Sequence, residues 1–307
     1  SVATVSEDGL VKARGTGIAQ IVVSTVDGNF KAICMVNVVS PIDKFEVDGL
    51  CFKAVSSGST NVKLTNNVYD YWPHEKPEYK PYKGHVVVPA SVTFEGVEYK
   101  VTTIGRDAFR NCPDLLSVTV SEGIIDLETD SVCACDKIEV LRLPSTTRGW
   151  AYGSTSNAVS RCPLLRIEIS GTRYSLVDDC LYDDSQHQLT WVPDWKETVV
   201  VKDGCGTIRT TVLDAKQVRK VVIPSSVSAV YAQNFQECAN LAEVDLDWDY
   251  DQLDDLTYEG RREGGHPEYF YFYGRVYSEI TIKVPSGMKD YYSNHKLWGM
   301  GFNIVEK

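Results

Sequence analysis

Two stretches of this chain repeat an apolar pattern at a fixed interval of 23 residues. In the first stretch, the positions that recur are Ile104, Phe109, Cys112, Leu115, Val118 and Val120, which return as Leu127, Val132, Cys135, Ile138, Leu141 and Leu143. In the second, Val212, Ala215, Val218, Val221 and Ile223 return as Phe235, Cys238, Leu241, Val244 and Leu246. A period in the twenties is the mark of a solenoid, whose coils bury their apolar faces only against neighbouring coils. The sequence therefore predicts an extended scaffold suited to binding.

Each repeat contains the apolar spacing of a strand followed by a turn. The strand spacing is L-x-x-L-x-L, as in Leu115, Val118 and Val120. Alternate residues of such strands point inward, and stacking at this period gives a parallel ladder. Residues 105–113 and their equivalents 233–239 are expected to form a helical turn whose aromatic and cysteine side chains face the core. The array becomes irregular at 144–171, where Cys135 and Cys162 are 27 residues apart, and again at 247–275.

These motifs resemble one known family. L-x-x-L-x-L is the strand signature of leucine-rich repeats, and residues 41–307 are similar to BspA-like leucine-rich repeat proteins. The resemblance is carried by 101–115, by 222–227, by the interruption Tyr174-Ser-Leu-Val-Asp-Asp-Cys-Leu-Tyr and by the C-terminal segment from Ile282 to Glu306. It implies a β-rich, irregular leucine-rich repeat solenoid with short helical turns. It also implies a C-terminal cap at about 276–307 and a place on the surface of gut or oral bacteria.

Residues 1–40 have a different pattern. Short β-prone runs at 2–5, 11–13, 19–25 and 32–39 are separated by turn signals such as Asp27-Gly28-Asn29. Ile21 and Val23, like Cys34, Val36 and Val38, alternate at period two, so each strand is expected to have one buried face. About forty residues cannot close a sandwich alone. Residues 1–39 resemble the C-terminal part of a group 2 bacterial Ig-like domain, which implies a partial Ig-like β-sandwich.

Composition excludes several classes of partner. The chain has 307 residues and a net charge of −11. Nucleic-acid binding depends on neutralising phosphates with Lys and Arg, so neither nucleic acid nor an anionic membrane surface is an expected partner. No apolar run approaches the roughly 18 residues that cross a bilayer, and the first residues do not form a signal peptide. The family resemblance implies an extracellular or outer-surface location, so we expect any targeting segment to have been removed.

The nine cysteines are expected to be core thiols. A disulfide scaffold is typically short, rich in Cys and even in count. Here Cys112, Cys135, Cys162 and Cys238 each lie three residues before a periodic Leu or Ile, where a free thiol behaves as a small apolar side chain. The alternative is a metal site, but Cys133-x-Cys135 lacks a second pair of ligands at zinc-site spacing.

The sequence lacks four common catalytic and cofactor-binding motifs. G-x-S-x-G, H-E-x-x-H, a phosphate-binding loop and G-x-G-x-x-G are all missing. None of the five histidines is paired with another ligand at i, i+4. We therefore expect a protein that is not an enzyme and needs no cofactor, although an acid pair formed only in the fold stays open.

An acidic run is the one metal candidate. Asp245, Asp247, Asp249 and Asp251 would lie on one face of an extended strand, and their carboxylates suit Ca²⁺. The EF-hand pattern fails, since Gln252 stands where that loop requires Gly. A solvated insertion is the simpler interpretation.

Aromatic residues are the better candidates for a binding surface. In the segment 269–277, strand alternation would place Tyr269, Tyr271 and Tyr273 on one face and two Phe on the other. The structural interpretation is Phe in the core with Tyr covering it; the functional one is a platform for sugar rings or a protein partner. The candidate surface is completed by Trp248, Trp72, Tyr71 and Tyr79.

The function expected from these observations is non-enzymatic binding at the cell surface or in secreted form. The family resemblance implies adhesion to host or bacterial surface proteins or to glycans, and a ladder suits large, flat ligands. The alternative is a structural spacer, or a component of a surface assembly, without a ligand of its own.

Overall fold

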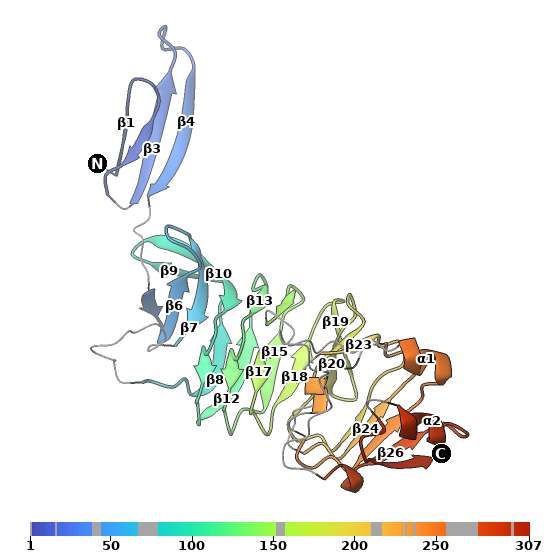
Figure 1. Cartoon of the computed structure of the whole chain (residues 1–307). Coiled ribbons are helices and arrows are strands. Elements are labelled where there is room, and N and C mark those ends of the chain that lie inside the picture. The colour runs from blue at the N-terminus through green and yellow to red at the C-terminus, as the bar shows by residue number, and fades with distance from the viewer. Residues whose placement is uncertain are drawn as a thin grey trace.

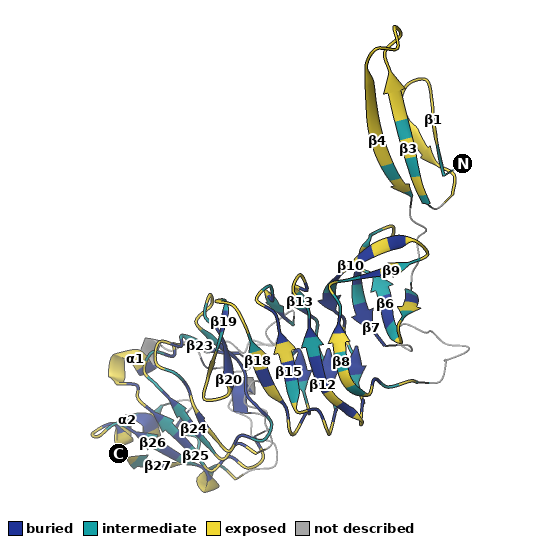
Figure 2. Ribbon diagram, turned by 180° about the vertical axis from the view of Figure 1, so that it is seen from behind, coloured by how far each residue is buried: buried dark blue, intermediate teal, exposed yellow. Residues whose placement is uncertain are grey.

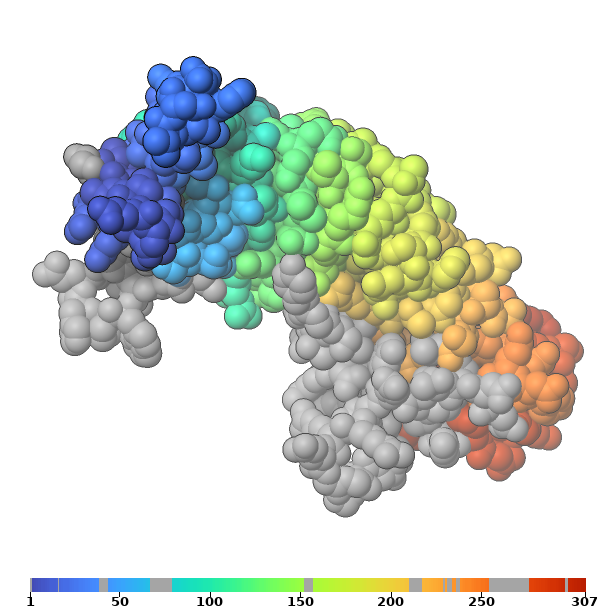
Figure 3. All heavy atoms as spheres, turned by 90° about the horizontal axis from the view of Figure 1, so that it is seen from above, coloured from blue at the N-terminus to red at the C-terminus, as the bar shows by residue number. Residues whose placement is uncertain are grey.

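The computed structural model describes most of the chain and shows a solenoid preceded by two hairpins (Figure 1). The described residues are 2–15, 17–38, 44–66, 79–151, 157–209, 217–228, 230, 232–235, 238–255, 276–295 and 298–307. Seen from above, the chain runs in order from blue at one end to red at the other (Figure 3). Successive coils are therefore stacked side by side along one direction.

The N-terminal hairpins have the strands that their turn signals predict. β1 (Ala3–Val5) pairs antiparallel with β2 (Val11–Ala13), and β3 (Gly17–Ser24) pairs antiparallel with β4 (Lys31–Val38). These hairpins stand apart from the solenoid (Figure 1). The boundary predicted near residue 40 lies outside the described residues, which resume at Lys44.

The prediction of a buried face on β3 and β4 is wrong for the described hairpins. Val23 and Cys34 are exposed, and Ile21, Val36 and Val38 are only partly buried. Figure 2 shows β3 and β4 as exposed or intermediate, whereas the solenoid strands contain many dark blue, buried segments. A period-two pattern buries a face only where another layer covers it, and here β1 and β2 are too short to do so.

The solenoid begins with antiparallel strands and then becomes a parallel ladder. β5 (Lys44–Val47), β6 (Leu50–Ala54) and β7 (Asn61–Thr65) form a meander, and β7 pairs in parallel with β10 (Val97–Ile104). β9 (Ser91–Phe94) folds back antiparallel onto β10. From β10 onward each turn of the chain adds a strand to each of three parallel sheets.

The three sheets of the first ladder reproduce the 23-residue period as strand register. One contains β10, β13 (Asp126–Leu127) and β16 (Gly149–Trp150); another contains β11 (Phe109–Arg110), β14 (Val132–Cys133) and β17 (Val159–Ser160). The third contains β8 (Gly84–Val88), β12 (Leu115–Val120), β15 (Val140–Leu143) and β18 (Arg166–Ile169). Ile104 pairs with Leu127, Phe109 with Val132 and Val118 with Leu141. The predicted solenoid is confirmed.

A hairpin interrupts the ladder before it resumes. β19 (Tyr174–Val177) and β20 (Cys180–Asp183) are antiparallel, and β21 (Gln188–Trp191) joins β20 to β23 (Thr207–Ile208). The second ladder is a five-stranded parallel sheet of β22 (Thr198–Val200), β24 (Lys220–Ile223), β25 (Glu243–Leu246), β26 (Thr281–Val284) and β27 (Asn303–Glu306). Short helices accompany it: η1 (Ala232–Phe235), α1 (Tyr250–Asp255), η2 (Tyr277–Glu279) and α2 (Lys289–Asn294).

The corners of the coils are tight turns, and at one of them the expected helical turn is wrong. Residues 105–113 form β11 between corners at Asp107 and Asn111, which have φ of 56° and 51°. The next coil repeats these values at Asp130 (52°) and Ala134 (53°). Left-handed backbone at a non-Gly residue is uncommon, so its recurrence marks a corner built into each coil. The equivalent 232–235 does form the helical turn η1.

The core follows the periodic positions in both ladders. Phe109, Leu115, Val118 and Leu141 are fully buried. All nine cysteines are free thiols, and every one except Cys34 is buried. The prediction that Cys112, Cys135, Cys162 and Cys238 are core thiols is confirmed. The thiol hydrogen of Cys135 is donated to the Phe109 carbonyl oxygen at 3.0 Å, so the column of thiols also satisfies its own polar groups.

Candidate binding surface

The outward positions of the first ladder align in rows across successive coils. One row contains His85, Ser117, Val140 and Arg166, each paired with the next through the β8–β12–β15–β18 register. His85 and Arg166 are exposed, Val140 is partly buried and Ser117 is buried. Within this row, His85 Nδ1 lies 2.8 Å from the hydroxyl oxygen of its neighbour Ser117. The neighbouring row includes Arg142 and Glu168, whose Nε and Oε2 lie 2.8 Å apart. The register therefore places side chains of successive coils next to one another.

The outward face of the second ladder is a self-neutralised network of ion pairs. Glu243 on β25 lies between Lys220 (2.7 Å) on β24 and Lys283 (3.0 Å) on β26. Lys307 pairs with Asp245 (2.5 Å) and with Asp247. The hydrogen bond from Lys220 holds the pKa of Glu243 below its usual range. Glu243, Asp245 and Asp247 each have a lysine partner within the same chain.

The acidic run does not have the geometry of the calcium candidate. β25 ends at Leu246, so Asp245 alone of the candidate ligands lies within a strand. Asp249 accepts the backbone N–H of Gln252 at 3.0 Å, and Asp251 lies in α1. The premise that Asp245, Asp247, Asp249 and Asp251 share an extended strand is therefore wrong. Within the described part of the chain, no group of three or more His, Cys, Asp or Glu side chains is arranged to hold a metal ion.

Trp248 is a core residue, which corrects its assignment to the candidate surface. Its side chain is fully buried, and its indole Nε1–H donates to the Val227 carbonyl at 2.8 Å. The ring centroid lies 6.1 Å from that of Trp298, and the Tyr292 hydroxyl donates to the Trp248 carbonyl at 3.1 Å. The inward positions Val244 and Leu246 precede Trp248 at period two. That alternation is the sequence signal that predicts burial here.

The other aromatic candidates fall mainly outside the described residues. This applies to Tyr71, Trp72, Tyr269, Tyr271 and Tyr273, which remain predictions. Tyr79 is described and is partly buried. Its hydroxyl donates to the Arg110 carbonyl and lies 3.6 Å from Cys112 Sγ. Burial raises the pKa of Tyr79. Tyr79 therefore packs against the first ladder, and the structure does not join it to Trp248.

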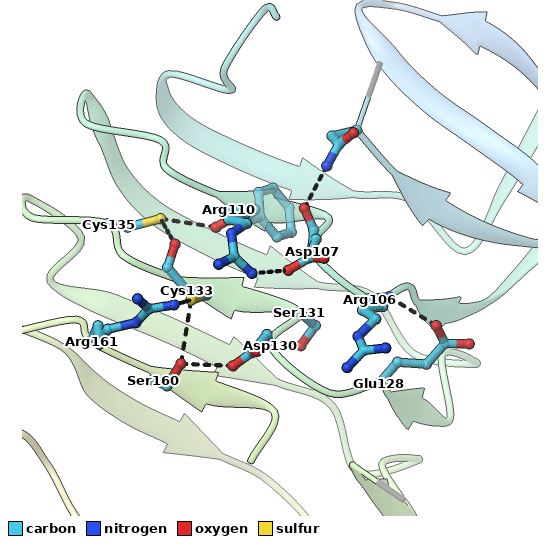
Figure 4. Close-up of polar contacts among 12 residues, drawn as sticks. Arg106, Asp107, Arg110, Glu128, Asp130, Ser131, Cys133, Cys135, Ser160 and Arg161 are labelled. Atoms are coloured by element: carbon cyan, nitrogen blue, oxygen red, sulfur yellow. Dashed lines mark hydrogen bonds and ion pairs between the residues drawn. The ribbon is translucent and has the colours of Figure 1, made fainter. Parts of the chain in front are cut away.

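A polar cluster lines the β11–β14–β17 side of the first ladder (Figure 4). Ser160 donates to Asp130 Oδ1 at 2.8 Å, and Arg161 Nη2 lies 3.0 Å from Cys133 Sγ. Arg110 pairs with Asp107 at 2.6 Å. Cys133 itself is fully buried, and these partners close over it. The cluster ties one coil to the next and leaves the thiol out of contact with solvent.

A stacked cation, which the sequence interpretation missed, lies at the end of the first ladder. The guanidinium carbon of Arg166 lies 5.0 Å from the centroid of the Trp195 ring. Trp195 belongs to the turn after β21, and its Nε1–H donates to the Leu165 carbonyl at 3.1 Å. Arg166 is exposed and Trp195 partly buried. The only sequence signal was their position in the irregular stretch between the two repeat arrays.

Comparison with known proteins agrees with this fold. Residues 91–150 and 197–261 match the family model "BspA type Leucine rich repeat region", with six copies. No curated protein matches the chain. Within the described residues, no helix has the length and apolar character needed to cross a membrane.

Several solved structures of leucine-rich repeat proteins are similar at low identity. A leucine-rich repeat protein from Bacteroides ovatus is 13% identical with a TM-score of 0.43, covering 85% of this chain and 67% of its own. A leucine rich cell surface protein from Faecalibacterium prausnitzii is 12% identical with a TM-score of 0.21, covering 71% and 98%. The pneumococcal vaccine antigen PcpA is 11% identical with a TM-score of 0.25, covering 86% and 98%.

The family match falls on both ladders. The period, the strand register and the matched residues agree with one another. The repeats at 91–150 and 197–261 are leucine-rich repeats of the BspA type.

Proposed function

We propose that this protein is a non-enzymatic binding protein of the bacterial cell surface or of the secreted fraction. The observation that carries the proposal is the alignment of outward side chains in rows across β8, β12, β15 and β18. Side chains held in register over several coils suit recognition of a large surface. The BspA type of the repeats and the surface location named for the Faecalibacterium prausnitzii protein support an extracellular site of action.

The partners proposed are host or bacterial surface proteins or glycans. The segment with Tyr269, Tyr271 and Tyr273 stays a candidate contact, since Tyr is favoured at recognition surfaces. The test is binding of the whole chain to an array of matrix proteins, bacterial surface proteins and glycans. A variant with all three tyrosines changed to Ala, checked by circular dichroism, asks whether the contact lies near the C-terminal end.

Binding that survives in the triple variant would keep the proposed function and move the site elsewhere. Absence of binding to every member of the array at micromolar protein would overturn the proposal in favour of a structural spacer. The spacer is the second candidate because Glu243, Lys220 and Lys283 on the second ladder are already paired with one another.

We also propose that residues 1–39 belong to an Ig-like sandwich. Support comes from the two antiparallel hairpins and from the apolar side chains of β3 and β4, which neither β1 nor β2 covers. In a sandwich such a face packs against a second sheet about 10 Å away. The test is hydrogen exchange of the β3 and β4 amides, which should be fast in this chain and slow when a second β-sheet is supplied to cover the apolar face.

A further inference from the structure

We propose that Arg166 and Trp195 form a recognition site for an acidic, apolar peptide segment of a protein partner. The inference rests on the proposed binding function and names the partner chemistry for one part of the surface. The site belongs to residues 151–196, between the two stretches that match the repeat family. Insertions in repeat proteins map to loops on one face, which is often the binding face.

The turn that carries the indole is held by two hydrogen bonds to the last coil of the first ladder. Trp195 donates its Nε1–H to the Leu165 carbonyl at 3.1 Å, and Asp194 Oδ2 accepts the Cys162 backbone N–H at 2.7 Å. The Lys196 ammonium lies 5.8 Å from the centroid of the Trp195 ring and pairs with Asp178 at 2.8 Å. The ring is therefore held before any partner arrives, which lowers the ordering cost of binding.

The Arg166 guanidinium lies against this ring, and the residue is exposed. A cation within about 6 Å of a Trp centroid is attracted to the ring, and the distance here is 5.0 Å. The guanidinium carries a planar fork of N–H donors, which matches the two oxygens of a carboxylate.

The cations around Arg166 are already paired, and Arg166 is not. Lys137 pairs with Asp114 at 2.7 Å, and Arg142 with Glu168 at 2.8 Å. Glu168, two residues from Arg166 on the same strand face, is thus engaged by another side chain. Among the described residues, Arg166 has no ion pair with a carboxylate. A carboxylate from outside the chain is therefore the missing partner.

An exposed apolar residue two positions from the cation in the sequence favours a peptide over a sugar acid. Leu164 lies two residues before Arg166 and is 52% exposed. Trp, Arg and a neighbouring apolar residue form the kind of cluster that dominates protein interfaces. A glycan carboxylate would need further hydrogen-bond donors next to Arg166, whereas Leu164 offers none. A peptide with Glu or Asp beside a large apolar residue would match both the Arg166 cation and the Leu164 side chain.

The experiment uses the full chain and an immobilised peptide of alternating Leu and Glu, with a Leu/Gln peptide and a glucuronic-acid oligosaccharide beside it. Measurements are made at physiological ionic strength, where charges more than about 8 Å away are largely screened. The wild type is expected to bind the Leu/Glu peptide alone. R166Q should weaken this binding by about tenfold or more, the size expected for an interface hot spot. R166K should weaken it too, because lysine keeps the charge but loses the planar donors.

K137Q is the matched control, since it removes an exposed cation one coil away that already has a partner. It should change binding by less than about twofold, as expected for an exposed pair. Equal losses of binding in R166Q and K137Q would overturn the proposal. So would wild-type protein that binds the oligosaccharide and not the peptide, or that binds neither of them. If R166Q still binds a member of the wider array as well as wild type does, this site fails while the proposed function stands.

Discussion

The N-terminal hairpins and the first ladder contain the same kind of strand in two different situations. β3 and β4 alternate apolar residues along one face, as β12 and β15 do. In the ladder, Val118 and Leu141 are fully buried, whereas Val23 of the hairpin is 64% exposed and Cys34 is exposed too. Alternating apolar residues therefore give a strand one apolar face. Whether that face is buried depends on whether another layer of the fold packs against it.

The ladder and the hairpins also gain their stability from different sources. In the ladder, each coil contributes side chains to a core that continues into the next coil, so stability is a sum of coil and interface terms. In the hairpins, backbone pairing is present without a comparable core, and an isolated two-stranded hairpin is marginal in water. Substitutions of the same chemical type should therefore have unequal effects in the two regions.

The largest difference is expected for an aromatic residue in each region. Trp248→Ala removes a fully buried indole and should lower the free energy of unfolding by about 3–5 kcal/mol. Phe30→Ala removes a ring that is 72% exposed and should change it by less than about 0.5 kcal/mol. Urea unfolding followed by circular dichroism gives both values. Similar losses of unfolding free energy for the two variants would show that the hairpins have a buried core of their own, contrary to this comparison.

A smaller effect is expected where the first ladder meets the second. Arg209 is 8% exposed, and its Nη1 donates to the Trp150 carbonyl at 2.7 Å, across 59 residues of sequence. Burial lowers the pKa of this guanidinium. Arg209→Met should cost about 1–3 kcal/mol, because a buried carbonyl loses its donor.

Arg148→Met is the control for this contact. Arg148 is exposed and donates only to nearby carbonyls, those of Ser145 and Thr147. Its replacement should change the unfolding midpoint little. Equal midpoints for the two variants would mean that Arg209 does not join the ladders.

The ion pairs of the second ladder should contribute about 1 kcal/mol or less. Glu243→Gln removes the centre of the Lys220 and Lys283 pairs, which are partly solvated. Since the folded-state pKa of Glu243 is lowered, its contribution is present above the unfolded pKa and is lost as pH falls through the folded one. The difference between wild type and variant should therefore vanish in acid. Glu7→Gln in the exposed turn between β1 and β2 is the control and should leave the unfolding midpoint at neutral pH unchanged. A difference that persists in acid for Glu243→Gln would contradict the assignment.

The smallest effect on stability is expected at Cys34. Cys34→Ser should leave the unfolding midpoint unchanged, because the side chain is exposed. The same variant should abolish thiol labelling of the folded protein by Ellman's reagent, since the other cysteines are buried and become reactive only on unfolding. Cys135→Ser is the contrast: it should lower stability while the folded protein still yields one labelled thiol. Labelling of a second thiol in the folded wild type would show that the core opens.

Much of the ladder can be predicted from the sequence because its register is local. The pairing of Val221 with Val244 and of Ile223 with Leu246 follows from the 23-residue period, since each coil meets only its neighbours. The core thiols follow from the same positions. The corner at Asp107 could not be predicted in this way, because its left-handed backbone depends on how three sheets meet.

The candidate surface was less predictable, for a physical reason. Tyrosine and tryptophan occur both in cores and on surfaces, so residue type alone suggested an exposed position for Trp248. The period-two alternation of the preceding strand indicates instead that Trp248 is buried. The stack of Arg166 on Trp195 joins residues that are 29 positions apart through an irregular turn. No period connects such residues, and only the folded chain brings them together.

The parallel register has a mechanical consequence. Since each coil is hydrogen-bonded only to the coils beside it, a pulling force on the two ends loads these interfaces one after another. Releasing a coil of about 23 residues would add roughly 80 Å of extended chain, at about 3.5 Å per residue. A chain anchored at one end and bound at the other would then yield in steps, lengthening by a coil at a time before the whole ladder is lost.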